Sequence, residues 1–84
     1  MKVQKNDGSF QEFDRTKIVG GVVKSGGTAE QAESIASQIE AWAPSVTVGG
    51  VIKSADIKVK LLELLGAVNP AAKASFEGFV KPNH

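Results

Sequence analysis

Residues 5–18, KNDGSFQEFDRTKI, decide how the N-terminal part of the chain folds. The Asp7-Gly8 step stands between residues of strand character and favours a positive φ in a tight turn, which predicts a two-stranded hairpin. The second strand is expected to end at Phe13, and Asp14 is suited to cap a helix. This stretch therefore predicts a hairpin that leads directly into a helix.

A second informative segment, IKSADI at residues 52–57, lies further along the chain. Ser54 is suited to cap a helix that carries Lys58 near its start. The start of a helix leaves backbone N–H groups without partners and has a partial positive charge, so it attracts anions. Together with Lys5 and Lys17, this helix start has the groups that a polyphosphate needs.

The two segments resemble the ATP-cone, a small nucleotide-binding regulatory domain of ribonucleotide reductases and of the repressor that controls their genes. The family's usual order is a strand, a Lys-Arg-Asp/Asn-Gly-like turn, a second strand, an Asp/Asn-x-x-Lys-Ile helix start, and later an Ile-x-Ser/Thr-x-Asp/Glu-Ile helix start. This order and spacing agree from Val3 to about Val80. The chain departs from the family at Asn6, where Arg is most common, so one cation is missing. The resemblance implies a four-helix bundle capped by a three-stranded sheet.

The resemblance also implies which residues meet the nucleotide. Two lysines look like phosphate-facing cations, the serine of the second segment like a hydroxyl donor, and Gln11 and Asp14 like contacts to the base or ribose. The candidate nucleotide-binding set, including positions that differ from the usual family residue, is Lys5, Asn6, Gln11, Asp14, Lys17, Ser54 and Lys58. Taken singly, each residue has an ordinary interpretation, because an exposed hairpin lysine is usually solvated and a serine at this point is most simply a helix cap.

Apolar periodicity extends the first helix beyond the hairpin. Ile18, Val22 and Val23 fall on one helical stripe. Gly20 and Gly21 lie inside this helix at a cost of about 1 kcal/mol each relative to Ala. They indicate a close approach by a neighbouring helix or the sheet, or simple tolerance of a weak helix.

Stripes and helix-start signals predict three further helices. Thr28 and Gln31 fit a capping box at the start of the second helix, and Asn69-Pro70 fits the start of the last one. Between them, residues 46–52 fit a third short strand, although a loop fits nearly as well. The predicted core is Ile18, Val22, Ile35, Ile39, Trp42, Ile57, Leu61, Leu65 and Phe76, with Phe79 and Val80 also on the inner face of the last helix, which Pro82 ends. The predicted class is α+β, in the order β-β-α-α-β-α-α, within one domain over residues 1–84.

The composition restricts the class of protein. Eighty-four residues with 42% hydrophobic and 23% charged residues are typical of one small globular domain. A net charge of +1 argues against duplex-DNA binding, and the absence of cysteine excludes disulfides and Cys-based zinc sites. No apolar run is long enough to span a membrane and no signal-like stretch follows Lys2, so we expect a cytoplasmic location. The single histidine, His84, and the lack of a Ser-His pair or Walker loop argue against an enzyme.

Three functions stay open at this point. The first is a stand-alone sensor that binds ATP or dATP, with or without Mg²⁺, and acts on a ribonucleotide reductase or another regulated protein. The second is a degenerate cone that serves in protein interaction or oligomerisation without nucleotide, for which Asn6 is the main evidence. The third is a small transcriptional cofactor without direct contact to nucleic acid. The partner, the preference between ATP and dATP, and whether the chain forms a homo-oligomer are not decided by the sequence.

Overall fold

The computed structural model describes the backbone of residues 1–80 and the side chains of residues 1–78, and it has the predicted α+β class. The elements, in chain order, are β1 Lys2–Gln4, β2 Phe10–Glu12, α1 Arg15–Lys24, α2 Ala29–Trp42, the 3₁₀ helix η1 Ala43–Ser45, β3 Val51–Lys53, α3 Ser54–Val68 and α4 Pro70–Val80. The predicted order β-β-α-α-β-α-α is therefore confirmed. The predictions for the side chains of Phe79 and Val80, and for Pro82 and His84, lie outside the described residues.

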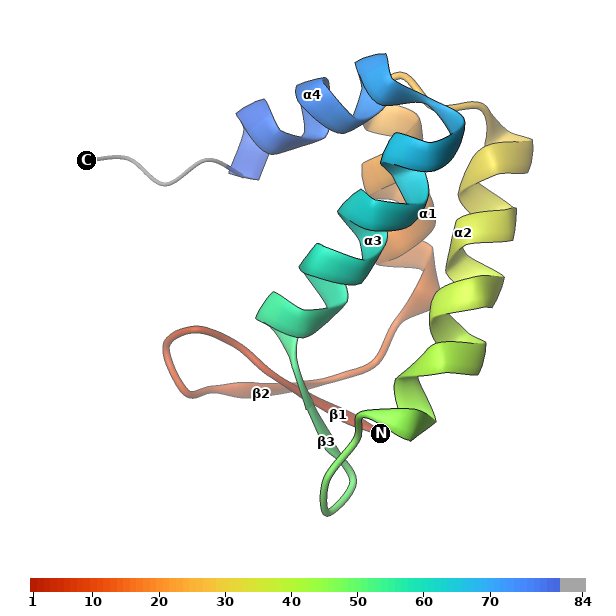
Figure 1. Ribbon diagram of the computed structural model, residues 1–84. Helices are drawn as coiled ribbons and strands as arrows, with labels where there is room; N and C mark the ends of the chain where they lie inside the picture. Colours follow the sequence, from red (N-terminus) through yellow and green to blue (C-terminus); the bar gives the residue numbers. More distant parts are fainter. Residues whose placement is uncertain (81–84) are drawn as a thin grey trace.

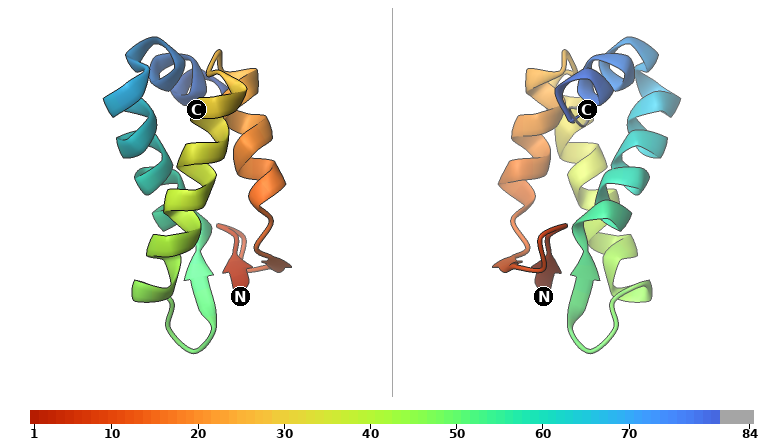
Figure 2. Two further views of the ribbon diagram at one scale, coloured as in Figure 1. Left: turned by 90° about the vertical axis from the view of Figure 1, so that its right-hand side faces the viewer. Right: turned by 90° about the vertical axis from the view of Figure 1, so that its left-hand side faces the viewer.

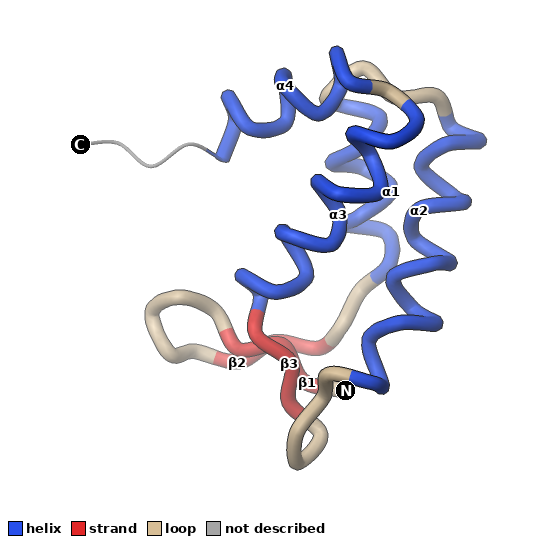
Figure 3. The backbone as a smooth tube through the Cα atoms, viewed as in Figure 1, coloured by secondary structure: helices blue, strands red, loops and turns tan. Residues whose placement is uncertain are grey.

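The sheet forms one end of the molecule, and the helices extend away from it (Figure 1). Helices α1, α2 and α3 stand beside one another, and α4 crosses the end of the bundle that lies farthest from the sheet, as the two side views also show (Figure 2). The loop between β1 and β2 projects past the start of α3 on the side toward which α4 runs (Figure 3). This arrangement leaves one face of α3 between the loop and α4.

Strand β1 lies in the middle of a mixed sheet with the order β2-β1-β3. It pairs antiparallel with β2, where Val3 is opposite Gln11, and parallel with β3, where Val3 is opposite Ile52. Parallel pairing needs a long crossover, which α1 and α2 provide. Because side chains alternate along a strand, Val3 and Ile52 share one face of the sheet, where both are buried with Ala43.

A glycine closes the turn between β1 and β2. Gly8 has a φ of +89°, and its N–H donates to the carbonyl of Lys5 at 2.9 Å. The Lys5 N–H donates in turn to the carbonyl of Ser9 at 2.8 Å. Asp7 accepts hydrogen bonds from the N–H and the hydroxyl of Ser9, which lower the pKa of Asp7. The hairpin predicted from Asp7-Gly8 is thus confirmed, with the positive φ at the glycine.

The main core lies between the helices and contains most of the predicted residues. Ile18, Val22, Ile35, Ile39, Leu61 and Leu65 are buried, while Trp42, Ile57 and Phe76 are partly buried and pack against them. The small residues Ala32 and Ala36 of the second helical stripe and Ala72 of the last one were also expected to face the core, and all three are buried.

Two predictions about α1 need correction. Val23 is 46% exposed, so its assignment to the inner stripe is wrong. The reason is that consecutive helical residues point about 100° apart, and Val22 already faces the core. The predicted close approach holds at Gly21, where an added Cβ would lie 3.1 Å from the Phe76 ring, whereas Gly20 has no atom within 4 Å of that position.

Three of the four α-helices that the structure describes begin with the predicted side-chain caps. Asp14 accepts from the Thr16 N–H, Thr28 and Gln31 form the full capping box, and Asn69 accepts from the Ala72 N–H at 3.0 Å. The predicted cap at Ser54 is wrong. The N-cap is Lys53, which keeps an extended conformation (φ −79°, ψ 137°) without a side-chain cap, and Ser54 is the first helical residue. This shift arises because β3 continues into α3 with no intervening loop.

The third strand is shorter than the predicted 46–52. Only Val51–Lys53 forms β3. Val46 instead has a φ of −117° and a ψ of −1° after the 3₁₀ helix, and Val48 forms a single isolated bridge with Val51. Gly49 and Gly50 both have positive φ and make the turn between Val48 and Val51. The loop alternative therefore holds for residues 46–48.

Candidate functional site

A pocket of about 470 Å³, here called the main pocket, lies between the β1–β2 loop, α1, α3 and α4. Its lining is mostly apolar, with a few polar side chains. The lining residues are Asn6, Lys17, Ile18, Gly21, Ser54, Ala55, Ile57, Lys58, Val59, Leu61, Leu62 and Phe76. An apolar wall with a small number of polar groups, in a volume of this size, is typical of small-molecule sites.

Two smaller hollows adjoin the main pocket. The first, the Gln11 hollow, has about 130 Å³ and is lined by Val3, Gln11, Glu12, Phe13, Asp14, Lys17, Ile18, Ser54 and Ile57. It shares its last four residues with the main pocket. The second, the Lys53 hollow, has about 270 Å³ and is lined by Gln4, Lys5, Asn6, Gly8, Lys53 and Ala55. Asn6 and Ala55 border both this hollow and the main pocket, so the three spaces follow one another along the start of α3.

The seven residues predicted for the site all line these three spaces. Four of them border the main pocket, namely Asn6, Lys17, Ser54 and Lys58. Gln11 and Asp14 lie in the Gln11 hollow, and Lys5 lies in the Lys53 hollow. The fold therefore brings the hairpin, the start of α1 and the start of α3 together, although their roles toward a ligand remain predictions.

The main pocket is locally cationic. Lys17 and Lys58 border it, and no carboxylate is among its described lining residues. Like charges repel in a partly apolar site unless an anion lies between them, so this lining favours a negatively charged ligand. The chain as a whole has a net charge of only +1, which makes the clustering a local feature.

The start of α3 adds to this positive character. Of the four α-helices in residues 1–80, α3 is the one whose N-cap makes no side-chain hydrogen bond to the first turn. The first N–H groups of an α-helix have no partners within the helix. Ser54 and Ala55, at this start, border the main pocket, so the partial positive charge of the helix start lies at its edge.

Polar contacts orient the side chains at the boundary of the Gln11 hollow. The Lys17 Nζ donates to the Gln11 Oε1 at 3.0 Å, which links α1 to β2. Asp14 uses one carboxylate oxygen to accept from the N–H and the hydroxyl of Thr16, and these bonds lower the pKa of Asp14. Asp14 thus acts first as a helix cap, and its other oxygen makes no hydrogen bond within residues 1–80.

Arg15 is a cation near the hairpin that does not border these spaces. Its Nη1 donates to the Glu33 Oε1 at 2.7 Å, and its Nε donates to the Glu40 Oε1 at 2.9 Å. These two carboxylates raise the pKa of Arg15 and fasten α1 to α2. Its role is therefore structural.

The predicted set omitted several lining residues. Phe76 and Gly21 form part of the apolar wall, and Lys53 gives its hollow a second cation beside Lys5. Phe76 was predicted only as a core residue, because a helical stripe does not distinguish a core position from a pocket wall. The signal for Lys53 was its place directly before Ser54 at the end of a β-branched segment.

Other kinds of site receive no support from the described structure. No group of three or more His, Cys, Asp or Glu side chains that could hold a metal ion is found among these residues. Likewise, none of the described helices has the length and apolar character needed to cross a membrane.

Comparison with known proteins identifies the family. The sequence matches the model of the ATP cone domain over residues 1–76, which is most of the chain, so the protein belongs to the ATP-cone family. ATP-cone domains are generally allosteric, nucleotide-binding regulatory modules. No curated protein matches the sequence.

Proposed function

We propose that this ATP-cone domain is a reversible sensor of adenine nucleotides, that it binds ATP or dATP in the main pocket, and that it acts as a regulatory module rather than as an enzyme. The observation that carries the proposal is the main pocket itself. An apolar wall, two lysines and an uncapped helix start meet there without a carboxylate among the described lining residues. A nucleotide has the matching chemistry, because it joins a flat apolar base to a polyanion.

The order of the three spaces suggests how the nucleotide lies. Ile18 and Ile57 border both the main pocket and the Gln11 hollow, and they offer the base an apolar surface. Gln11 and Asp14 then stand at the edge of the base or ribose. The phosphates extend in the other direction, along the start of α3 past Ala55 toward the Lys53 hollow.

The phosphate contacts we propose are made by Lys17, Lys58 and Ser54, with Asn6 at the far border of the pocket and Lys5 beyond it. A charge-assisted contact contributes about 1.5–3 kcal/mol. Two or three such contacts support binding at about micromolar strength or weaker. Asn6 contributes a neutral amide in place of a cation, which reduces the affinity. Mg²⁺ would neutralise part of the triphosphate charge, so binding is to be measured with and without it.

For regulation, the nucleotide must bind two states of the protein or its assembly with different affinity. The partner we propose, from the family resemblance, is a ribonucleotide reductase or another protein whose activity follows the adenine nucleotide pool. This proposal treats residues 1–84 as one domain and places it in the cytoplasm, where these nucleotides are made and used.

One observation favours a second candidate function. Asn6 borders both the main pocket and the Lys53 hollow, so a neutral side chain stands at the point where a polyphosphate would pass. A domain that had lost nucleotide binding and kept the fold as a protein-interaction module would tolerate such a residue.

Calorimetric titration of the wild-type protein with ATP, dATP and ADP, each with and without Mg²⁺, decides between the two. We expect saturable binding of ATP or dATP at one site per chain. The absence of binding heat and of amide shift changes at millimolar ATP would reject the sensor and leave the interaction module.

A further inference from the structure

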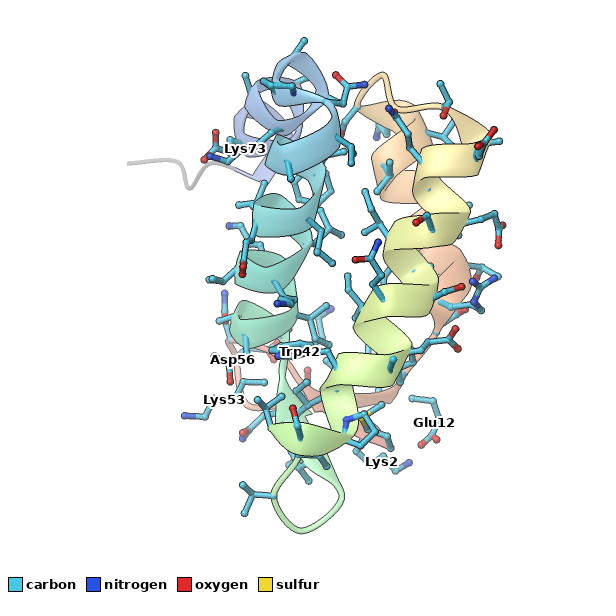
Figure 4. All side chains as sticks on the ribbon, turned by 45° about the vertical axis from the view of Figure 1, so that its right-hand side comes forward. Lys2, Glu12, Trp42, Lys53, Asp56 and Lys73 are labelled. Carbon is cyan, nitrogen blue, oxygen red and sulfur yellow. The ribbon has the colours of Figure 1, made fainter. Side chains whose placement is uncertain are left out.

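The Lys53 hollow combines two lysines that the fold brings to one edge of the sheet. Parallel pairing of β1 and β3 places Gln4 opposite Lys53, so the ends of both strands meet at that edge. Lys5 follows β1 directly, and Lys53 is the last residue of β3. Figure 4 shows Lys53 near the start of α3. Both lysines line the same hollow of about 270 Å³.

The charges in this hollow are not balanced by carboxylates. Its described lining contains neither Asp nor Glu, and neither Lys5 nor Lys53 takes part in an ion pair among residues 1–80. The nearby Asp7 has its carboxylate bonded to Ser9, and the charge of Lys5 is only a lesser cause of its lowered pKa. Two lysines that line one hollow without a bound carboxylate favour an anion between them.

The hollow also continues the main pocket. Asn6 and Ala55 border both spaces, so a chain of phosphates that starts beside Ser54 reaches the hollow after passing Ala55. Each further phosphate lengthens a polyphosphate by one P–O–P bridge. The first phosphate would therefore remain in the main pocket, and only the end of a longer polyphosphate would reach Lys5 and Lys53.

We propose that Lys53 is a specificity-determining residue that, together with Lys5, binds the terminal phosphate of a nucleoside triphosphate in the Lys53 hollow. Lys53 thereby supplies, from β3, a cation at the border where Asn6 supplies none. This inference rests on the proposed nucleotide binding in the main pocket. If Lys53 has this role, the domain distinguishes nucleotides by the length of their phosphate chain, because a monophosphate does not extend into the Lys53 hollow.

The test compares ATP and AMP on matched variants by calorimetry or by amide shift titration. Lys53→Gln removes the charge from an exposed side chain, and Lys53→Arg retains it. The control Lys24→Gln removes one charge at the last residue of α1. We expect Lys53→Gln to weaken ATP binding about tenfold and to change AMP binding less than about twofold. Lys53→Arg and Lys24→Gln should both stay within about threefold of the wild-type protein for ATP.

The outcomes separate this inference from the proposed function. If the wild-type protein binds ATP but Lys53→Gln binds it equally well, or loses ATP and AMP affinity by the same factor, then Lys53 does not contact the terminal phosphate and the inference is wrong. If Lys24→Gln weakens ATP binding as much as Lys53→Gln, the effect is one of net charge, and the inference is also wrong. If the wild-type protein binds neither nucleotide, the proposed function fails and the inference fails with it. Unchanged thermal unfolding of Lys53→Gln shows that a loss of binding does not come from a loss of folding.

Discussion

Lys17→Gln is the substitution that most directly changes the proposed phosphate site. Lys17 borders both the main pocket and the Gln11 hollow, and its Nζ donates to the Gln11 Oε1 at 3.0 Å. Glutamine has a helix propensity close to that of lysine and retains much of the side-chain length. The exchange therefore removes the charge while leaving α1 and its packing in place.

The expected loss of ATP affinity follows from the environment of the side chain. A charge-assisted hydrogen bond contributes about 1.5–3 kcal/mol, which corresponds to a factor between about 10 and 150. Lys17 is exposed to solvent, and salt screens such charges with a Debye length of about 10 Å at about 0.1 M. The lower end of the range applies, and we expect Lys17→Gln to weaken ATP binding about tenfold, with a smaller effect at high salt.

Calorimetric titration at low and high salt measures this change, with Lys24→Gln as the control of equal charge. The unfolding free energy should change by less than about 0.5 kcal/mol, because an exposed lysine with one hydrogen bond to Gln11 contributes little to stability. An ATP affinity within twofold of the wild-type value, in a protein that binds ATP, would refute the assignment of Lys17 to the phosphates. If Lys17→Gln and Lys24→Gln lose the same ATP affinity, the loss is a general effect of net charge and not of a contact between Lys17 and the phosphates.

Three other substitutions test the core, the phosphate path and the cap of α1. Leu65 is fully buried, so Leu65→Ala should lower the unfolding free energy by about 2–5 kcal/mol in denaturant titrations, and a change under 1 kcal/mol would show that the core is misassigned. Asn6→Arg should strengthen ATP binding by about threefold or more, because it adds a cation between the main pocket and the Lys53 hollow; unchanged affinity would contradict that position for the phosphates. The hydrogen bonds from Thr16 lower the pKa of Asp14 in the folded state, so they stabilise the protein above the unfolded pKa, and this contribution is lost as the pH falls through the folded pKa. Asp14→Asn should therefore lose less thermal stability than the wild-type protein between about pH 5 and pH 2, and equal losses would show that Asp14 has no such role.

The features of the fold that sequence could predict are local. The capping box of Thr28 and Gln31 and the Asn69 cap depend on residues within one helical turn, and both are found where expected. Ser54 shows the limit of this reasoning. β3 runs directly into α3, and the residue that takes the last extended conformation is Lys53, one position earlier. A local pattern cannot decide which of two adjacent residues changes conformation when strand pairing holds the first of them.

Only the local parts of the site could be predicted from the sequence. The family resemblance indicated the hairpin and the start of α3, but the proximity of the two depends on parallel pairing between β1 and β3, which are far apart in the sequence. The apolar wall was not recognised because Phe76 reaches it from α4, where its ring lies against Gly21. Such an approach depends on how two helices cross, and the spacing of apolar residues along one helix does not contain that information.

ATP binding in the main pocket is best tested by a map of backbone amide shifts during titration with ATP. We predict a cluster of changes at Asn6, Lys17 and residues 54–58, with further changes on the face of α4 that carries Phe76. Residues 29–42 of α2 do not border the pocket and should change little. Saturable changes confined to α2, or no changes at millimolar ATP, would contradict the claim.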